Sequence, residues 1–205
     1  PYVKIPKMLA AGYKPSGDWR GSKATIFEGG HRVPFLVRWP GKVKAGTTSD
    51  VTICTTDFFG TFAEILAALK SIPVNAAEDS FSFLSCLKGE KRAIRPFTIH
   101  HSIGGTFAIR KGDWKLILSK SARGGWSKTS GATGKVVQLY NLADDPAETK
   151  NLEDRHPEKI KELVADLAEA FRNGRTTQGP VQSNEGWPFL DKKMMQHFPE
   201  LAEVK

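Results

Sequence analysis

The stretch Thr106–Ser119, with the sequence TFAIRKGDWKLILS, decides how the second half of this chain folds. Its two apolar runs, residues 106–110 and 114–119, have the length of short strands, and Lys111-Gly112-Asp113 between them is a turn sequence. The stretch therefore predicts a β-hairpin.

Further elements are predicted on both sides of this hairpin. Phe97–His101 and Val136–Tyr140 have strand-like patterns, so we expect a small antiparallel sheet. Residues 120–135 are rich in Gly, Ser and Lys and are expected to form a loop. Pro157 begins a helix whose apolar face should pack on the sheet, and Gly174 is the natural end of that helix.

The chain before this sheet has a different character. Residues 12–34 are dense in glycine and proline, which predicts a long loop, and such loops are usually functional. The apolar run Val33–Trp39 is predicted to be a buried strand. Thr55–Leu69 begins with capping residues and has apolar residues at helical spacing, so it predicts a helix. A shorter helix is expected around Phe83–Leu87.

The composition is that of a globular domain, because 40% of the 205 residues are hydrophobic and 25% are charged. The formal charge of +8 is unevenly distributed. Residues 1–50 hold nine Lys and Arg against three Asp and Glu, residues 51–140 hold twelve against six, and residues 141–205 hold nine against thirteen. The first two thirds can therefore present a positive surface to a nucleic acid, an anionic polysaccharide, or a single phosphate or sulfate group.

Several classes of protein are excluded. No apolar run approaches the roughly 20 residues of a membrane helix, and residues 1–11 lack the pattern of a signal peptide. Cys54 and Cys86 are too few for a disulfide scaffold or a cysteine-rich zinc site. We expect buried free thiols, with a single bridge as the alternative. The complete motifs of serine hydrolases, P-loop proteins, zinc proteases and EF-hands are absent.

Two groups of residues are candidates for chemistry. The segment Arg20–Pro34 places Lys23 and Arg32 in a glycine-rich backbone, which permits close approach of an oxyanion to a compact ammonium charge. The alternative for this segment is an ordinary charged surface loop. His100 and His101 are neighbours on a predicted strand, so one should be buried and the other displayed. Alternatively, both bind backbone or water at a sheet edge.

These segments resemble the second half of the arylsulfatase family, within the alkaline phosphatase superfamily. Several motifs in the same order make the resemblance specific, and they span roughly residues 12–180. The motifs are Gly21-x-Lys23-x-x-x-x-Glu28-Gly29-Gly30-x-Arg32-Val33-Pro34, Arg38-Trp39-Pro40-Gly41, Thr56-Asp57-Phe58-Phe59, the Ser-Phe-Leu segment within Asp79–Gly89, His100-His101-Ser102, Phe107–Ile117, and Leu139-Tyr140-Asn141-Leu142 followed by Asp145-Pro146-x-Glu148-x-x-Asn151-Leu152.

The resemblance implies a sulfate-ester hydrolase with a formylglycine nucleophile, made from Cys or Ser in the motif C/S-x-P-x-R, and a divalent cation, usually calcium. Lys23 matches the family's lysine that contacts the sulfate. A fixed cation at that position stabilises the charge that develops on the sulfuryl oxygens in the transition state. His100 or His101 is expected to contact the leaving group or the sugar, and Arg20 is expected to bind substrate.

The departures from the family pattern decide how much of a sulfatase is present. Neither Cys54 nor Cys86 lies in the nucleophile motif, and the family's acidic metal ligands lie upstream of the Lys23 motif, so no metal site is carried over. We therefore expect the C-terminal portion of a sulfatase, inactive alone, with an α/β fold that is an α+β excerpt. Its expected parts are the end of an alkaline-phosphatase-like α/β domain over residues 1–90, a small antiparallel-sheet subdomain packed by a helix over residues 91–175, and a tail over residues 176–205.

The expected partners follow from the same resemblance. They are a sulfated small molecule or sulfated carbohydrate and, if the chain is a fragment, the N-terminal sulfatase segment. Neither nucleic acid nor a membrane is expected as a partner, and the family leads us to expect a periplasmic or secreted protein. Two alternatives remain open: a basic module that binds anionic polysaccharide or nucleic acid, and a sulfatase-like chain that has lost catalysis.

Overall fold

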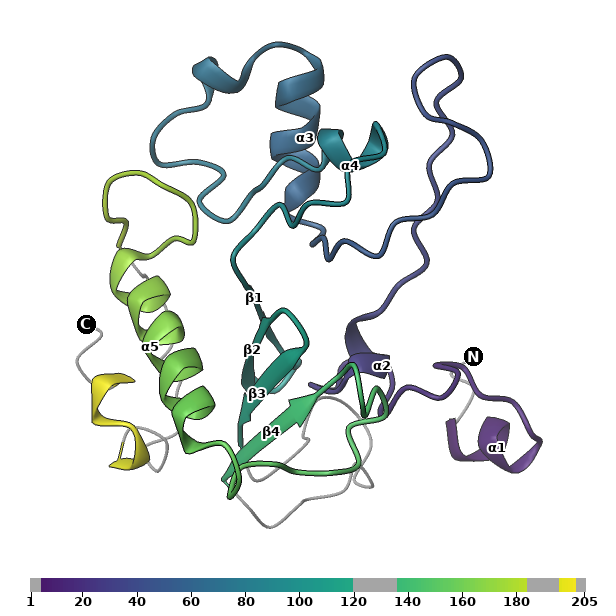
Figure 1. Ribbon diagram of the computed structural model, residues 1–205, viewed down its shortest axis with the longest axis vertical. Coiled ribbons are helices and arrows are strands. Elements are labelled where there is room, and N and C mark those ends of the chain that lie inside the picture. The colour runs from purple at the N-terminus through teal and green to yellow at the C-terminus, as the bar shows by residue number, and fades with distance from the viewer. Residues whose placement is uncertain (1–4, 120–135, 184–195, 202–205) are drawn as a thin grey trace. The chain divides into compact units, whose positions relative to one another are not determined.

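The computed structural model describes residues 5–119, 136–183 and 196–201. Among them the packing defines two compact units. Unit 1 contains the described parts of residues 1–33, 99–167 and 187–203, and unit 2 contains those of 34–98 and 168–186. The elements (Figure 1) are α1 (Ile5–Ala10), α2 (Glu28–His31), α3 (Asp57–Ile65), η1 (Leu69–Ser71), α4 (Leu84–Leu87), β1 (Thr98–His101), β2 (Phe107–Lys111), β3 (Trp114–Leu118), β4 (Val137–Asn141), α5 (Pro157–Asn173) and η2 (Pro199–Leu201).

The predicted hairpin and sheet are confirmed in unit 1. The strands follow the order β1-β2-β3-β4, and β2 pairs antiparallel with β3 through the register Ala108↔Ile117 to Lys111↔Trp114. Gly112 in the connecting turn has a φ of +59°, a backbone conformation that glycine adopts without strain. Strand β4 then pairs antiparallel with β3, with Lys115 opposite Tyr140.

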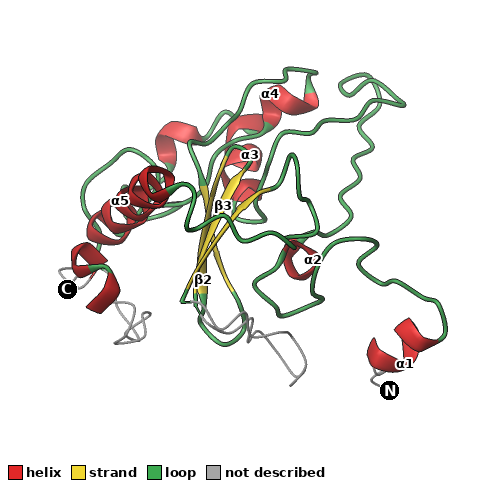
Figure 2. Ribbon diagram, turned by 60° about the horizontal axis from the view of Figure 1, so that its bottom comes forward, coloured by secondary structure: helices red, strands yellow, loops and turns green. Residues whose placement is uncertain are grey.

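Side chains alternate along a strand, so the sheet has two distinct faces. One face carries the fully buried Ile109, Leu116 and Leu139. Helix α5 lies beside the sheet in both ribbon views (Figures 1 and 2), with Leu163, Val164 and Leu167 buried. At the end of β2, Lys111 Nζ lies 2.9 Å from Glu162 Oε1 and 2.8 Å from Asp166 Oδ2. The helix predicted from Pro157 is confirmed, and Gly174 follows it with a φ of +60°.

The opposite face of the sheet is covered by the segment that contains Lys23. Ile26 and Phe27 of that segment form one buried cluster with Ala108, Ile117, Tyr140 and Leu142. Helix α2, which follows this segment directly, lies on the other side of the sheet from α5 (Figure 2). The long glycine-rich loop predicted over residues 12–34 therefore contributes Ile26 and Phe27 to the core of unit 1.

Unit 2 is organised around a buried acid. Asp57 at the start of α3 is fully buried, and its Oδ2 accepts the N–H of Cys54 at 2.7 Å. Its Oδ1 accepts the N–H of Phe81 at 2.9 Å and also binds the guanidinium of Arg95. Helices α3 and α4 confirm the predictions for these stretches. Cys54 and Cys86 are both free thiols, and burial raises the pKa of Cys54.

The buried strand predicted over Val33–Trp39 is wrong for this structure. The run has no regular secondary structure, and Leu36 is 90% exposed. A strand forms only where another segment pairs with its backbone, and an apolar one of this kind is covered on both faces of its sheet. The described sheet consists of β1 to β4 alone. Apolar side chains of α3 are exposed as well, with Phe62 56% accessible.

Other expectations are left untested. The loop predicted over residues 120–135 and the tail residues Trp187, Phe189, Met194 and Met195 lie outside the described residues. The domain limits expected near residues 90 and 175 stay a prediction, since the two units group segments by their packing.

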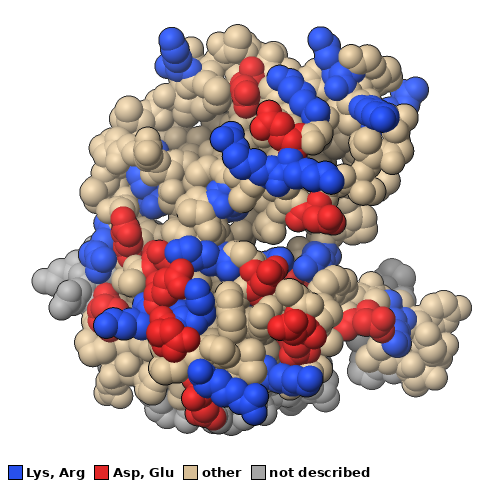
Figure 3. Space-filling model, in the orientation of Figure 1, with Lys and Arg blue, Asp and Glu red and all other residues tan. Residues whose placement is uncertain are grey.

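On the face shown in Figure 3, Asp and Glu side chains lie among the Lys and Arg side chains.

The Asp57–Arg95 pair generates a stability prediction. The Arg95 side chain is only 6% exposed, so Asp57→Ala leaves a buried guanidinium without its carboxylate. We expect the free energy of unfolding, measured by urea denaturation, to fall by about 3–5 kcal/mol. The exposed Asp50→Ala is the control and should leave it unchanged. A loss below about 1 kcal/mol, the size typical of a surface ion pair, would contradict the buried role.

Candidate functional site

The lysine loop, defined here as residues Arg20–Gly29, is closed by its own hydrogen bonds. The N–H of Gly29 donates to the Arg20 carbonyl at 2.8 Å and joins the two ends. In the middle, the Thr25 N–H and hydroxyl donate to the Ser22 carbonyl at 3.0 and 2.8 Å. The Ser22 N–H in turn donates to the Thr25 hydroxyl at 3.1 Å. These bonds fix the backbone on both sides of Lys23.

Glycine is required in this loop for close packing. A Cβ atom on Gly29 would lie 2.7 Å from the carbonyl oxygens of Arg20 and Gly21, and one on Gly30 would lie 2.2 Å from that of Thr25. Both distances are far below van der Waals contact. The Gly29-Gly30 pair, which the sequence marked as permissive for an anion, thus serves to bring backbone segments together.

Lys23 is displayed on this braced backbone. Its side chain is exposed, whereas Ile26 and Phe27 further along the loop are buried. Ala24, directly after Lys23, has a φ of +80°, which costs a non-glycine residue on the order of 1 kcal/mol. The Ala24 carbonyl accepts the N–H of Ile103 at 3.2 Å, so the lysine loop is joined to the turn that follows His100 and His101.

A buried cluster of ionised side chains joins the lysine loop to the sheet. The ammonium of Lys115 is fully buried and lies 2.9 Å from the Ile26 carbonyl oxygen and 3.0 Å from Glu28 Oε1. Glu148 Oε1 lies 2.8 Å away, in an ion pair without hydrogen-bond geometry. Glu28 also binds Arg110, at 3.3 Å. The cluster therefore joins β2, β3, α2 and the turn after β4.

The two carboxylates of this cluster have shifted pKa values of opposite sign. Burial acts to raise the pKa of Glu28, but the charges of Lys115, Arg110 and Arg32 outweigh it and lower that pKa below its usual value. For Glu148, burial is the larger effect and raises the pKa despite the ion pair with Lys115. Glu28 is thus the firmly ionised partner of Lys115.

The histidines are arranged as an unequal set. His100 packs against His31, with ring centroids 4.1 Å apart, and the Nε2 atom of each is buried without a hydrogen-bond partner among the described residues. Burial, together with the charge of Lys115, lowers the pKa of His31 to about 4 and that of His100 well below its usual value, so both imidazoles are neutral at pH 7. His101 is exposed, and its Nδ1 lies 2.8 Å from the Ser102 carbonyl oxygen.

The prediction that the two strand histidines differ in exposure is confirmed, but His100 is half-buried, with its Nε2 atom shielded from solvent, rather than fully buried. The structure adds His31, which the sequence did not single out. Its only signal was its place directly after Gly29-Gly30 in the lysine motif. Nothing in the sequence pairs it with His100, which lies on a strand far along the chain.

Arg20 is turned into the molecule. Its Nη1 donates to the Tyr140 hydroxyl at 3.1 Å and to the Glu148 carbonyl at 2.7 Å, and its guanidinium lies 3.8 Å from the Phe27 ring centroid. It also borders an open pocket of about 660 Å³ together with Asp18 and Tyr140. These contacts hold the lysine loop, and the expected role of Arg20 in binding substrate stays a prediction.

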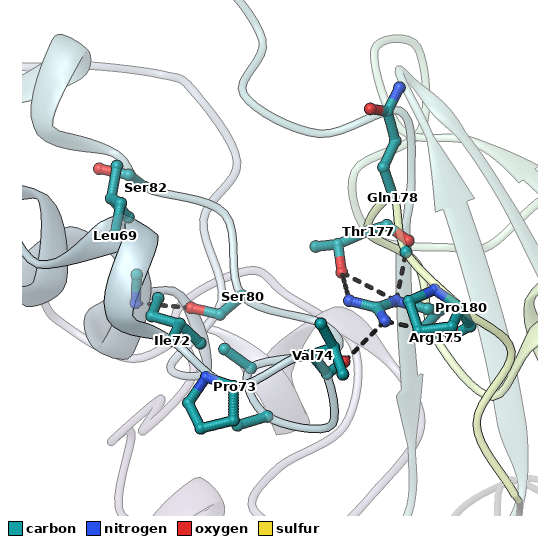
Figure 4. A pocket seen from close by; sticks show the side chains of 14 residues that line it. Leu69, Ile72, Pro73, Val74, Ser80, Ser82, Arg175, Thr177, Gln178 and Pro180 are labelled. Carbon is teal, nitrogen blue, oxygen red and sulfur yellow. Dashed lines mark hydrogen bonds between the residues drawn. The ribbon is translucent and has the colours of Figure 1, made fainter.

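A second pocket, of about 300 Å³, lies within unit 2 (Figure 4). The buried Arg175 donates there to the carbonyls of Val74 at 3.0 Å and Pro180 at 3.2 Å, and to the Thr177 hydroxyl at 3.0 Å. Because these acceptors belong to the surrounding loops, the guanidinium ties them together. This pocket is a structural feature of unit 2.

Metal ligands do not gather in the described part of the chain, where no group of three or more His, Cys, Asp or Glu side chains is placed to hold an ion. The buried acids Glu28 and Glu148 are committed to Lys115 and, for Glu28, to Arg110 and Arg32. These residues therefore do not fit a calcium site. None of the described helices has both the length and the apolar character needed to cross a membrane.

Known proteins share this fold. A solved sulfatase structure from Bacteroides thetaiotaomicron, from work on the metabolism of multiple glycosaminoglycans, superimposes with a TM-score of 0.68 at 35% identity and covers 78% of this chain and 33% of that one. A sulfatase structure from Pseudoalteromonas has a TM-score of 0.60 at 24% identity, covers 74% of this chain and 32% of that one, and shows the fold alone. The fold is thus that of sulfatases, as the sequence predicted.

The chain belongs to the family described as N-sulphoglucosamine sulphohydrolase, C-terminal, whose sequence profile matches residues 18–177. Among curated relatives, an N-acetylgalactosamine-6-O-sulfatase of Bacteroides thetaiotaomicron is 35% identical over 163 residues, which are 78% of this chain and 31% of that protein. Arylsulfatase G of Homo sapiens is 29% identical, over 74% of this chain and 31% of that protein. The chain spans about a third of the length of these relatives.

The His31–His100 pair generates a prediction on pH. In the unfolded chain each imidazole takes up a proton near pH 6.5, whereas His31 in the folded protein stays neutral down to about pH 4. Between these values the unfolded state binds more protons, so stability is lost as the pH falls from about 6.5 to about 4. Thermal unfolding across this range should show that loss, with a shallower pH dependence for His31→Phe.

The control for this experiment is His156→Ala, which removes an imidazole outside the pair, packed 4.9 Å from the Trp114 ring. It should keep the pH dependence of the wild type. If the thermal stability of His31→Phe depended on pH as strongly as that of the wild type, the claim that the folded protein keeps this histidine pair neutral would be contradicted.

Proposed function

We propose that this chain is the C-terminal portion of a sulfatase that hydrolyses sulfate esters, and that Lys23 contacts the sulfate group. The observation that carries the proposal is the exposed ammonium of Lys23 on a loop closed at both ends, in a chain of a sulfatase family. An exposed lysine on a mobile loop would be a poor oxyanion ligand, because its position would have to be fixed during the reaction. Here the backbone is fixed in advance.

The proposed contribution of this chain is electrostatic. When a sulfate ester is cleaved, negative charge develops on the sulfuryl oxygens and on the departing oxygen. The Lys23 ammonium would stabilise the charge on the sulfuryl oxygens. His101 is exposed at the end of β1, and the Ala24–Ile103 hydrogen bond holds the turn after it beside the lysine loop. We assign the exposed His101, rather than His100, which packs against His31, to the leaving group or sugar.

The formylglycine and the calcium ion that the family resemblance implies would come from other parts of the parent protein. Cys54 and Cys86 lie outside the nucleophile motif, and the described residues do not fit a calcium site. The described residues of this chain therefore hold neither the formylglycine nor the calcium ion. The isolated chain would be inactive.

The remaining part of the sulfatase is also the partner we propose for the exposed apolar surface of unit 2. Phe59 and Phe62 of α3 are 55 and 56% exposed, Leu66 directly after the helix is 76% exposed, and Leu36 is 90% exposed. Exposed apolar surface of this extent marks an interaction site in soluble proteins. A preceding segment with strands and helices of its own would cover it and would pair the backbone of the run around Leu36.

The substrate class that we propose is sulfated carbohydrate. The relative with 35% identity is named for the 6-O-sulfate of N-acetylgalactosamine, and the exposed Lys23 in a chain of net charge +8 suits an anionic substrate. An exported, periplasmic or secreted location is part of the same proposal. A general binding module for nucleic acid is less favoured, because Asp and Glu side chains lie among the Lys and Arg side chains on the face in Figure 3.

Lys23→Ala in the full-length protein tests the proposal. Loss of a fixed cation at the sulfuryl oxygens should lower kcat/KM for a sulfate ester on the order of 100-fold, as loss of an oxyanion contact does. Lys161→Ala removes an exposed lysine from α5 and should leave turnover unchanged. Near-normal turnover of Lys23→Ala would exclude the role of Lys23.

The incompleteness of the chain is tested separately. Residues 1–205 purified alone should release no sulfate from an aryl sulfate or from N-acetylgalactosamine 6-sulfate, with or without added calcium. The full-length protein, assayed in parallel, is the positive control. Measurable turnover by the isolated chain would contradict the proposed division of the active site.

A further inference from the structure

The turn after β4 carries the Asp145-Pro146-x-Glu148 motif, which the proposed function does not use. Asp145 shapes this turn, because its carboxylate accepts the N–H groups of Thr149 and Lys150, each at 2.7 Å, and the Thr149 hydroxyl at 2.9 Å. Glu148 in the turn has a φ of +54°, a conformation that is uncommon for a non-glycine residue. Its side chain is nevertheless fully buried.

Glu148 contacts both ends of the lysine loop. At the start of the loop, Arg20 Nη1 donates to the Glu148 carbonyl at 2.7 Å. Near its end, the N–H of Glu28 donates to Glu148 Oε2 at 2.7 Å. The third contact is indirect, since Glu148 Oε1 pairs with Lys115, whose ammonium donates to the Ile26 carbonyl. One residue therefore binds the segments before and after Lys23.

We propose that Glu148 is a positioning residue for Lys23: it holds the two ends of the lysine loop on the sheet so that the Lys23 ammonium stays where the sulfate binds. This inference rests on the proposed function of Lys23. Glu148 is buried beneath the loop, so it acts through the Arg20 guanidinium, the Glu28 backbone N–H and, by way of Lys115, the Ile26 carbonyl, and it touches no substrate.

The physical reason is the cost of fixing a loop. A loop whose ends are free must lose conformational entropy each time its lysine engages an anion, and that cost lowers the stabilisation of the transition state. With Glu148 in place, the loop loses this conformational entropy when the protein folds, before any anion binds. Glu148→Ala removes the acceptor of the Glu28 N–H and one of the two carboxylates at Lys115, but leaves the Lys23 side chain intact.

A double-mutant cycle in the full-length protein tests this coupling. Glu148→Ala should lower kcat/KM for a sulfate ester by about 10- to 100-fold, the effect of a misplaced catalytic group. In a Lys23→Ala background the same change should cost less than about twofold, because residues that act together are not additive. Losses that multiply in the double variant would overturn the inference, since damage unrelated to Lys23 would lower the activity of either background.

Hydrogen exchange of the same full-length proteins gives a second readout. Glu148→Ala should speed exchange at the amides of Glu28 and Gly29, while the amides of β3 and β4 keep their protection. Glu148→Gln, which retains an amide oxygen for the Glu28 N–H, should restore part of the protection and activity, and it also serves if the alanine variant does not fold. The exposed Glu169→Ala on α5 is the matched control. Unchanged exchange in the lysine loop of both Glu148 variants would overturn the inference.

The two proposals fail in different ways. A wild-type protein that cleaves no sulfate ester, or a Lys23→Ala variant with normal turnover, removes the proposed function and this inference with it. If activity depends on Lys23, but Glu148→Ala lowers it by the same factor with and without Lys23, the proposed function stands and only this inference is overturned.

Discussion

The buried ammonium of Lys115 is the interaction on which unit 1 depends. A charge placed within a sheet loses its hydration, at a cost of several kcal/mol, unless carboxylates and carbonyls replace the water. For Lys115 these groups come from the lysine loop through Ile26 and Glu28, and from the turn after β4 through Glu148. The sheet, the loop and the turn must therefore assemble together, because none of them alone satisfies the charge.

This constraint explains other features of the site. The same positive charge, added to burial, keeps His31 and His100 neutral. The strained backbone at Ala24 and Glu148 is tolerated because residues around each of them are held by hydrogen bonds to distant segments. In return the loop presents one free ammonium, that of Lys23, while the cations beneath it are matched by acids. The Lys23 ammonium is thus a fixed cation on a support whose own charges are paired, and such a cation is suited to stabilising an oxyanion.

The sequence pattern correctly predicted the elements that depend on interactions between residues close together in the chain. The hairpin around Gly112, the helix from Pro157 and the opposite facing of His100 and His101 follow from strand alternation, turn chemistry and helical spacing. The Lys115 cluster could not be predicted, because Lys115 lies in an apolar strand and its partner Glu28 is 87 residues away. The strand expected at Val33–Trp39 failed for the same kind of reason, since a strand forms only where another chain segment pairs with it. The glycine-rich pattern made Lys23 a candidate, but only the family resemblance selected it, because a charged surface loop and an oxyanion-binding loop look alike in sequence.

Binding of inorganic sulfate to the full-length protein measures the central claim most directly, namely that the buried Lys115 cluster holds Lys23 in place for a sulfate group. Calorimetric titration should be made for the wild type, Lys23→Ala and Lys115→Met, each shown to be folded by circular dichroism. The account predicts that both variants lose sulfate affinity by similar factors, about tenfold or more for loss of one well-placed charge contact. A folded Lys115→Met variant that binds sulfate as tightly as the wild type would contradict it.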